Sequence, residues 1–441
     1  MAQRLISSAP NFGAQFQAFL DLKREVSDDV DKAVRGILTD VRERGDAALV
    51  ALTEKFDRLA LTPERLRISD AERADAVANC PPDALEALKF AHARIEKHHR
   101  RQKPADDHYV DDLGVTLGTR WTAVEAAGLY VPGGLASYPS SVLMNAVPAR
   151  VAGVPRVVMV VPSPGGALNP LVLAAADIAG VDEIYRIGGA QAIAALAFGT
   201  ETIAPVAKIV GPGNAFVAAA KRQVFGAVGI DSVAGPSEVL VIADRHNDPA
   251  WIAADLLAQA EHDTAAQSIL MTDDAAFADA VEVEVSRQLS DLPRGNIAGE
   301  SWQTFGGVIL VESLTAEAPR LADRIAAEHL EIATADADAL AARIRNAGAI
   351  FLGAHTPEVI GDYVSGSNHV LPTARSAKYA SGLGVLDFMK RTSLLKLNEA
   401  SLSALAGPAM KLARAEGLEA HRRSVEIRLA PRAVSRDHGV D

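Results

Sequence analysis

From about Leu129 onward, short runs of β-branched residues alternate with segments of helical periodicity, and this alternation limits the possible folds more than any other feature. Residues 157–161 form the continuous run Val-Val-Met-Val-Val, a turn sequence follows at residues 162–166, and residues 170–179 have the pattern of a helix. A continuous apolar run of this length indicates a strand that is buried on both faces. Buried parallel strands joined by crossover helices are therefore predicted.

The alternation forms two series. The strands of the first series are predicted at residues 157–161, 183–187 and 208–210, with helices at residues 170–179, 191–198 and 214–225. The strands of the second are predicted at residues 238–243, 268–271, 308–311, 331–333 and 349–352, with helices between them, among them residues 250–261 and 274–289. The first 128 residues are expected to be mostly helical, and the tail after Lys390 to be helical with a terminal strand at residues 425–429.

The predicted fold class is α/β, with two Rossmann-like units whose parallel-rich sheets are flanked by helices, plus N-terminal helices and a C-terminal helical extension. A chain of 441 residues agrees with this, because one domain has roughly 100–200 residues. The expected division is residues 1–25 as an N-terminal helical segment, 26–128 together with 238–385 as the first α/β domain, 129–237 as the second α/β domain, and 386–441 as the C-terminal extension.

Charge and cysteine usage exclude several classes of function. The net charge of -12 argues against nucleic acid and anionic membranes as partners and favours small molecules. No run of about 18 apolar residues occurs, and the N-terminus lacks the pattern of a secretory signal. Cys80 is the single cysteine, so no internal disulfide is expected, and a reducing, cytoplasmic compartment fits best.

Three glycine-rich turns lie in the first series, at residues 130–134, 188–191 and 211–214. Turns that open helices are where α/β folds bind anionic phosphate groups. None has the three spaced glycines of the dinucleotide fingerprint, since Phe216 stands where the third would be. Each turn alone is compatible with ordinary turn chemistry. The three together favour a nucleotide site.

Gln259 and His262 are three residues apart, so on a helix they would lie on one face and reach the same metal ion. A pair cannot complete the coordination shell of zinc, which takes nitrogen, oxygen or sulfur ligands. Because Cys80 is the only cysteine, the remaining ligands must be imidazole, carboxylate or amide groups.

Glu328 and His329 lie where a predicted helix gives way to a strand, which we take for the edge on which open α/β sheets place functional groups. Adjacent helical side chains do not face each other, so the pair is expected to perform separate proton transfers. The alternative is a solvated pair at a helix end.

Other polar residues leave similar alternatives open. Asp362 and His369 are expected in a polar loop, as ligand contacts or as turn formers, and His421 lies in a charged helix where an exposed histidine is the alternative. His98 and His99 belong to a basic helix and are expected to face solvent.

Together these residues carry a resemblance to the histidinol dehydrogenase family that extends over nearly the whole chain. One departure is visible, because the family usually has Pro before Glu-His, where this chain has Ala326-Ala327. The segments that carry the resemblance are residues 128–134, 139–145, 187–191, 210–214, 230–239, 255–263, 328–331 and 361–373.

The resemblance implies a zinc- and NAD-dependent oxidoreductase of histidine biosynthesis. Members of the family oxidise L-histidinol through L-histidinal to L-histidine, a four-electron oxidation that reduces two NAD molecules. The implied shell of one Zn²⁺ per subunit is Gln259, His262, Asp362 and His421. In the family the last ligand comes from the partner subunit, so a homodimer with shared active sites is expected. The C-terminal extension would contribute to that partner's site.

The resemblance also assigns roles to individual residues. His329 would remove the alcohol proton, and Glu328 would activate the water that adds to the aldehyde. The zinc would chiefly position the substrate nitrogens. The resemblance also implies that the four zinc ligands and His329 contact the substrate. Further substrate contacts are implied at Ser237, His369 and Glu416, and NAD contacts at Tyr130, Gln191 and Asn214, on the domain of residues 129–237.

Two other functions compete with this one. The first is a paralogous NAD-dependent dehydrogenase of another small polar alcohol, which would be expected to change a zinc or substrate position. The second is a non-catalytic metal- or ligand-binding protein, which would not need both Glu328 and His329.

Overall fold

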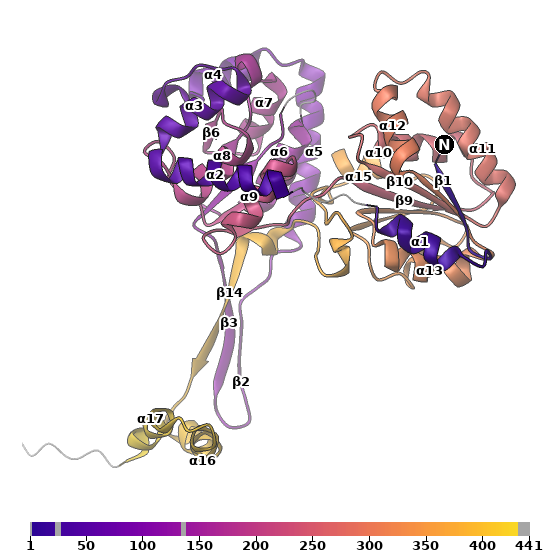
Figure 1. The fold of residues 1–441 in the computed structure, drawn as a ribbon. Helices are drawn as coiled ribbons and strands as arrows, with labels where there is room; N and C mark the ends of the chain where they lie inside the picture. Colours follow the sequence, from indigo (N-terminus) through magenta and orange to yellow (C-terminus); the bar gives the residue numbers. More distant parts are fainter. Residues whose placement is uncertain (1, 23–27, 134–137, 431–441) are drawn as a thin grey trace, which may run out of the picture. The chain divides into compact units, whose positions relative to one another are not determined.

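The computed structural model of the protein describes residues 2–22, 28–133 and 138–430 (Figure 1). The chain divides into two compact units, the first made of Met1–Lys103 with Val124–Phe388 and the second of Pro104–Ala123 with Met389–Asp441. Parallel sheets flanked by helices dominate the first unit, so the predicted α/β fold class is confirmed.

A six-stranded parallel sheet in the first unit has the order β1-β11-β10-β9-β12-β13. Its five C-terminal strands lie where the second apolar series predicted them, whereas β1 was not predicted. The strands are β1 (Gln3–Ile6), β9 (Glu238–Ala243), β10 (Gln267–Thr272), β11 (Gly307–Leu310), β12 (His329–Ala333) and β13 (Ala349–Leu352).

Helices cover both faces of this sheet, as Figure 1 shows. Successive side chains of a strand point to opposite faces. In β9, Val239 and Val241 accordingly pack against the α10–α12 side, and Leu240 and Ile242 against the α1–α13 side. One face carries α10 (Pro249–Ala260), α11 (Ala275–Leu289) and α12 (Gly295–Phe305), and the other α1 (Phe12–Leu20), α13 (Leu314–Ile325) and α14 (Ala337–Ala341).

A five-stranded parallel sheet, also in the first unit, has the order β6-β5-β4-β7-β8. Its strands are β4 (Ala126–Tyr130), β5 (Arg156–Val160), β6 (Glu183–Tyr185), β7 (Lys208–Val210) and β8 (Gly229–Ile230). Its helices are α6 (Pro139–Ala152), α7 (Pro170–Ile178), α8 (Gly189–Phe198) and α9 (Ala215–Val224).

The N-terminal helices α2 (Asp28–Arg44) and α3 (Asp46–Asp57) share a core with the five-stranded sheet. The apolar stripe Val34, Leu38 and Val41 of α2 packs with residues of α8 and α9. This packing differs from the predicted grouping of residues 26–128 with 238–385, because an amphipathic stripe does not specify which sheet it will cover. Two further helices, α4 (Asp70–Ala78) and α5 (Pro82–Arg100), precede the sheet in sequence.

The second unit consists of an antiparallel sheet and a helical pair. The sheet, of order β14-β3-β2, contains β2 (Asp107–Val110), β3 (Thr116–Ala123) and β14 (Met389–Lys396), which replace the predicted helical structure there. The pair is α16 (Glu399–Ala415) and α17 (Glu419–Leu429), so the strand predicted at residues 425–429 is wrong. Its alternating pattern belongs to a helix in which Arg422 pairs with Glu426 one turn later, at 2.6 Å.

Among the described residues, no helix is both long enough and apolar enough to cross a bilayer.

Gly307 of β11 offers a test of how the N-terminal segment docks. A Cβ atom at this position would lie 2.6 Å from the Phe19 ring of α1. Gly307→Ala is therefore expected to displace Phe19 and lower the free energy of unfolding by about 1–3 kcal/mol. Gly13→Ala on α1, where a Cβ meets nothing within 4 Å, is the control and is expected to be neutral or slightly stabilising. Denaturant unfolding of both variants measures the difference, and equal stabilities would contradict this account.

Candidate active site

The predicted acid and base residues lie at the amino edge of the six-stranded sheet. His329 is the first residue of β12 and pairs in register with Val239 of β9 and Ala349 of β13. We expected the functional edge of an open α/β sheet, which is the carboxyl edge, and this expectation is wrong. Helix α10 explains the difference, since it returns after β9 and brings Gln259, in its last turn, back to the amino edge.

His329 is buried among oxygen atoms. Its Nδ1–H donates to the carbonyl of Glu238 at 3.2 Å, which leaves Nε2 as the basic nitrogen of the neutral ring. Nε2 lies 3.5 Å from Asp362 Oδ1. Nδ1 lies 3.8 Å from one oxygen of Glu328 and 3.8 Å from one of Glu358. The side chains of Glu328 and His329 therefore lie close together. The expectation that adjacent helical side chains point apart does not apply to them, because helix α13 ends at Ile325.

Burial controls the protonation of these groups. It raises the pKa of Glu328 to about 7, although the charge of His329 opposes the shift, and it raises the pKa of Glu358 to about 8. Burial also disfavours the charged form of His329, but the surrounding carboxylates outweigh it and raise its pKa well above the ordinary value. For Asp362 the hydrogen bond and charge of His329 outweigh burial, so its pKa is lowered.

The carboxyl groups of Asp255 and Glu331 form a second buried pair, which is connected to Glu358. The backbone N–H of Glu358 donates to Glu331 Oε1 at 2.6 Å. Burial raises the pKa of Asp255 to about 6 and that of Glu331 well above its ordinary value, and the two side chains share a hydrogen bond. Two carboxyl groups in such contact hold a proton between them at neutral pH.

Gln259 and His262 meet as predicted, although His262 lies beyond the end of α10. The amide Nε2 of Gln259 and Nδ1 of His262 are 3.3 Å apart, and the His262 backbone N–H continues the turn by donating to the Gln259 carbonyl at 3.2 Å. Desolvation lowers the pKa of His262, while the Asp362 carboxylate opposes the shift.

The donor set around Gln259 fits a zinc ion. Gln259 is fully buried, and its Oε1 has no hydrogen-bond partner in the described part of the chain. A buried amide oxygen left without a partner is costly, and a cation would satisfy it. Residues 2–22, 28–133 and 138–430 contain no group of three or more His, Cys, Asp or Glu side chains arranged to hold a metal. Zinc binding by Gln259 and His262 stays a prediction.

Asp362 lies in helix α15 (Glu358–Tyr363) and not in the predicted loop. His369 does lie in a loop, where its Nδ1–H donates to the Asp362 carbonyl at 3.0 Å and its Nε2 accepts from Ser141 at 3.2 Å. The neighbouring Asn368 is 3.4 Å from Nε2 of His99. His99 is fully buried, so the prediction that it faces solvent is wrong, whereas His98 is exposed.

The three glycine-rich turns follow the carboxyl ends of strands in the five-stranded sheet. Tyr130 ends β4, and its hydroxyl accepts a hydrogen bond from the Gly189 N–H at 3.1 Å. Gln191 is buried in the first turn of α8. Asn214 caps α9 by accepting from two backbone N–H groups. The turns therefore converge, although Gly134 lies outside the described residues.

The remaining predicted residues are placed separately. Ser237 precedes β9, and its carbonyl accepts from Gln267 N–H at 3.0 Å. Glu416 and His421 belong to the second unit, at the end of α16 and within α17, and both are exposed in the single chain. Their roles at the site stay predictions.

Comparison with known proteins decides the family. The sequence profile of the histidinol dehydrogenase family matches residues 21–429. The chain is 66% identical to histidinol dehydrogenases of Rhizobium meliloti (strain 1021) and Brucella suis biovar 1, over 97% of this chain and 99% and 100% of those proteins. The chain belongs to the histidinol dehydrogenase family, as its motifs predicted. The crystal structure of histidinol dehydrogenase from Elizabethkingia anophelis has a TM-score of 0.92 and 35% identity, covering 97% of this chain and 98% of that one.

No role was predicted for the buried carboxyl groups of Glu358, Glu331 and Asp255, although Asp255 and Glu331 lie in segments that carry the family resemblance. A signal was present, because Glu331 interrupts the apolar strand His-Leu-Glu-Ile-Ala and Asp255 the apolar stretch of α10. A carboxyl group inside such a run is expected to be buried and therefore perturbed. No local pattern distinguishes Glu358, which becomes relevant only when α15 brings it to His329.

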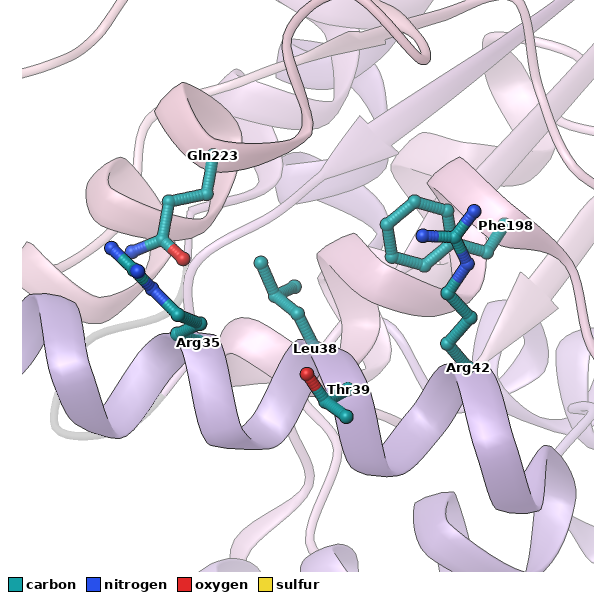
Figure 2. Close-up of a pocket in the computed structure, with 6 residues that line it drawn as sticks. All are labelled: Arg35, Leu38, Thr39, Arg42, Phe198 and Gln223. Carbon is teal, nitrogen blue, oxygen red and sulfur yellow. The ribbon is translucent and has the colours of Figure 1, made fainter.

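A surface hollow of about 330 Å³ is lined by residues of α2, α8 and α9 (Figure 2). Arg42 lies over the Phe198 ring at 4.9 Å there. None of the predicted site residues lines the hollow, whose lining is Arg35, Leu38, Thr39, Arg42, Phe198 and Gln223.

Glu331 generates a pH prediction. A carboxyl group whose pKa is raised by folding stabilises the folded state at low pH, and this contribution disappears as the pH rises through the folded pKa. The contribution of Glu331 to wild-type stability should therefore decrease as the pH rises from about 4.5 through its raised folded pKa. Glu331→Gln keeps the hydrogen bond to Asp255 without needing the proton, so its melting temperature should fall less steeply over that range. Exposed Glu300→Gln is the control, and parallel profiles for wild type and Glu331→Gln would contradict the assignment.

Proposed function

We propose that the protein is a zinc- and NAD-dependent histidinol dehydrogenase that oxidises L-histidinol through L-histidinal to L-histidine. The observation that carries the proposal is the buried His329, with Nε2 beside Asp362 and with Glu328 3.8 Å from Nδ1. Membership in the family supplies the substrate. A binding protein would not need an acid and a base that are both perturbed by burial.

His329 is the base that removes the alcohol proton. Its Nδ1–H is anchored on the Glu238 carbonyl, so the proton is received at Nε2. The anchor fixes the ring orientation, and the surrounding carboxylates stabilise the imidazolium that results.

Glu328 is the group that activates water for the aldehyde step. One of its oxygens accepts from the Glu238 N–H at 3.0 Å, which orients the carboxyl group. A pKa of about 7 lets it take and release a proton near neutral pH. Two residues with separate tasks suit two successive oxidations.

Zinc would be held by Gln259, His262 and Asp362, with the partner subunit's His421 as a further ligand. When bound, it would bind and orient the substrate nitrogens, which contributes to the rate through positioning. The unpartnered Oε1 of Gln259 is the feature of this chain that supports the assignment. The substrate contacts would be completed by Ser237 and His369 of the same subunit and by Glu416 of the partner subunit.

NAD would accept the two hydrides, one molecule for each oxidation. Its contacts would be Tyr130, Gln191 and Asn214, at the carboxyl ends of β4, β6 and β7. Ligands of parallel α/β sheets bind at this edge, where the chain order reverses. In this sheet the order reverses beside β4, which has β5 on one side and β7 on the other.

His421 provides the first test, through a shared zinc site. Purified zinc-loaded protein incubated with histidinol and NAD should form NADH. His421→Asn should lower zinc affinity at least about tenfold, because a coordinating imidazole is lost. His98→Asn, at an exposed position of α5, is the control. Unchanged zinc content in His421→Asn would contradict the ligand, and NADH formed only with another polar alcohol would support a paralogous dehydrogenase instead.

Glu328 provides the second test, through the two half-reactions. Glu328→Gln should slow the oxidation of histidinal by roughly 100-fold or more and that of histidinol less, because water activation belongs to the second step. Rates measured separately with each substrate give the comparison, and exposed Glu312→Gln is the control. Equal losses in both steps would refute the division of tasks.

A further inference from the structure

Gly211 occupies the point of the five-stranded sheet where chain order reverses. It follows β7 and has a φ of 109°, which favours glycine. A Cβ atom here would lie 2.2 Å from the Tyr130 carbonyl oxygen. Gly211 therefore packs closely against the end of β4. Any ligand at this crevice depends on how that turn is held.

Lys221 and Asp231 form a buried ion pair behind the turn. Their side chains are 2% and 5% exposed. Lys221 Nζ donates to the Gly211 carbonyl at 3.0 Å, and the Gly211 N–H donates to Asp231 Oδ2 at 2.8 Å. Both backbone polar groups of Gly211 are thus bound by one ion pair whose members come from α9 and from the end of β8.

Stability alone is a weak explanation for this arrangement. Burying two charges carries a desolvation cost that their attraction does not always exceed, and apolar residues of similar volume are often as stable. What apolar residues cannot do is bind the N–H and carbonyl of the same glycine. The pair therefore specifies the conformation of one turn.

We infer that Lys221 and Asp231 are positioning residues that hold the Gly211 turn in the conformation that receives the cofactor. The inference rests on the proposed function, since it takes NAD as the ligand of this turn. A preorganised turn does not have to be ordered when the ligand binds, so the pair contributes to affinity for NAD without touching it. It leaves the histidinol site at the other sheet unaffected.

The experiment replaces each member by a side chain of similar size. Lys221→Met and Asp231→Asn are expected to raise the Kd and the KM for NAD about tenfold, with kcat and the KM for histidinol nearly unchanged. Equilibrium binding of NAD to the zinc-loaded protein in the absence of histidinol measures the Kd without turnover. Hydrogen exchange of the amides of residues 211–214 should accelerate in both variants. Asp231→Asn is the milder change and keeps one acceptor oxygen, so it serves if Lys221→Met does not fold.

The control is the Arg156–Glu183 ion pair of the same sheet. It joins the first residues of β5 and β6 at 2.7 Å, at the opposite edge from the turn. Glu183→Gln should lower thermal stability without changing the Kd for NAD. If the Lys221 and Asp231 variants resemble it, losing stability but keeping the wild-type Kd and hydrogen exchange, the inference is overturned. Failure of wild-type protein to bind NAD would overturn the proposed cofactor instead. In that case, faster hydrogen exchange of residues 211–214 in the two variants would still show that Lys221 and Asp231 fix the conformation of the turn.

Discussion

The site depends on one constraint, which is that the His329 imidazole is buried among several carboxyl groups. Desolvation penalises every charge in this region, but the raised pKa of His329 and the lowered pKa of Asp362 favour opposite charges on these two groups once His329 has accepted a proton. The remaining carboxyl groups respond by retaining protons, as the raised pKa values of Glu328 and Glu358 show. Acid and base capacity near neutral pH therefore results from an excess of buried carboxyl groups around one base.

The direction of the crossover helices explains why the candidate residues lie at opposite edges of the two parallel sheets. In a parallel sheet each helix returns from the carboxyl edge to the amino edge. The last turn of α10 and the first residue of β12 therefore lie at the amino edge of the six-stranded sheet, where they bring Gln259 and His329. In the five-stranded sheet the glycine-rich turns open the helices and so lie at the carboxyl edge. Gln259 and His329 are thus held by regular elements, whereas the conformation of the turn at Gly211 is held by a buried ion pair.

Sequence periodicity predicted much of the fold, and its failures have physical causes. The buried β-branched strands β5, β7 and β9 were found because burial on both faces leaves an uninterrupted apolar run. The exposed β2, the partly exposed β3 and the exposed β14 carry no such run, so the sequence did not predict these strands. The apolar stripe of α2 was visible, but its partner sheet was not.

The candidate site was predicted through motifs, with contacts that only the structure supplies. The pair Gln259 and His262 could be anticipated from spacing, since three residues span one turn. The approach of Glu358 to His329 and the bonds of His369 to Asp362 and Ser141 join segments far apart in the chain. No periodicity encodes such pairs. His99 shows the converse, because its charged neighbours suggested solvent while Ile95 and Asn368 bury it.

The proposed zinc site would take three donors from the first unit, namely an amide oxygen, an imidazole and a carboxylate. Three protein donors that leave a position open for water or substrate are common at catalytic zinc sites. Asp362 is already paired with His329, and the imidazole of His369 has both nitrogens in hydrogen bonds. A fourth protein ligand, His421 of the partner subunit, stays a prediction, and its exposure on α17 in the single chain is compatible with it.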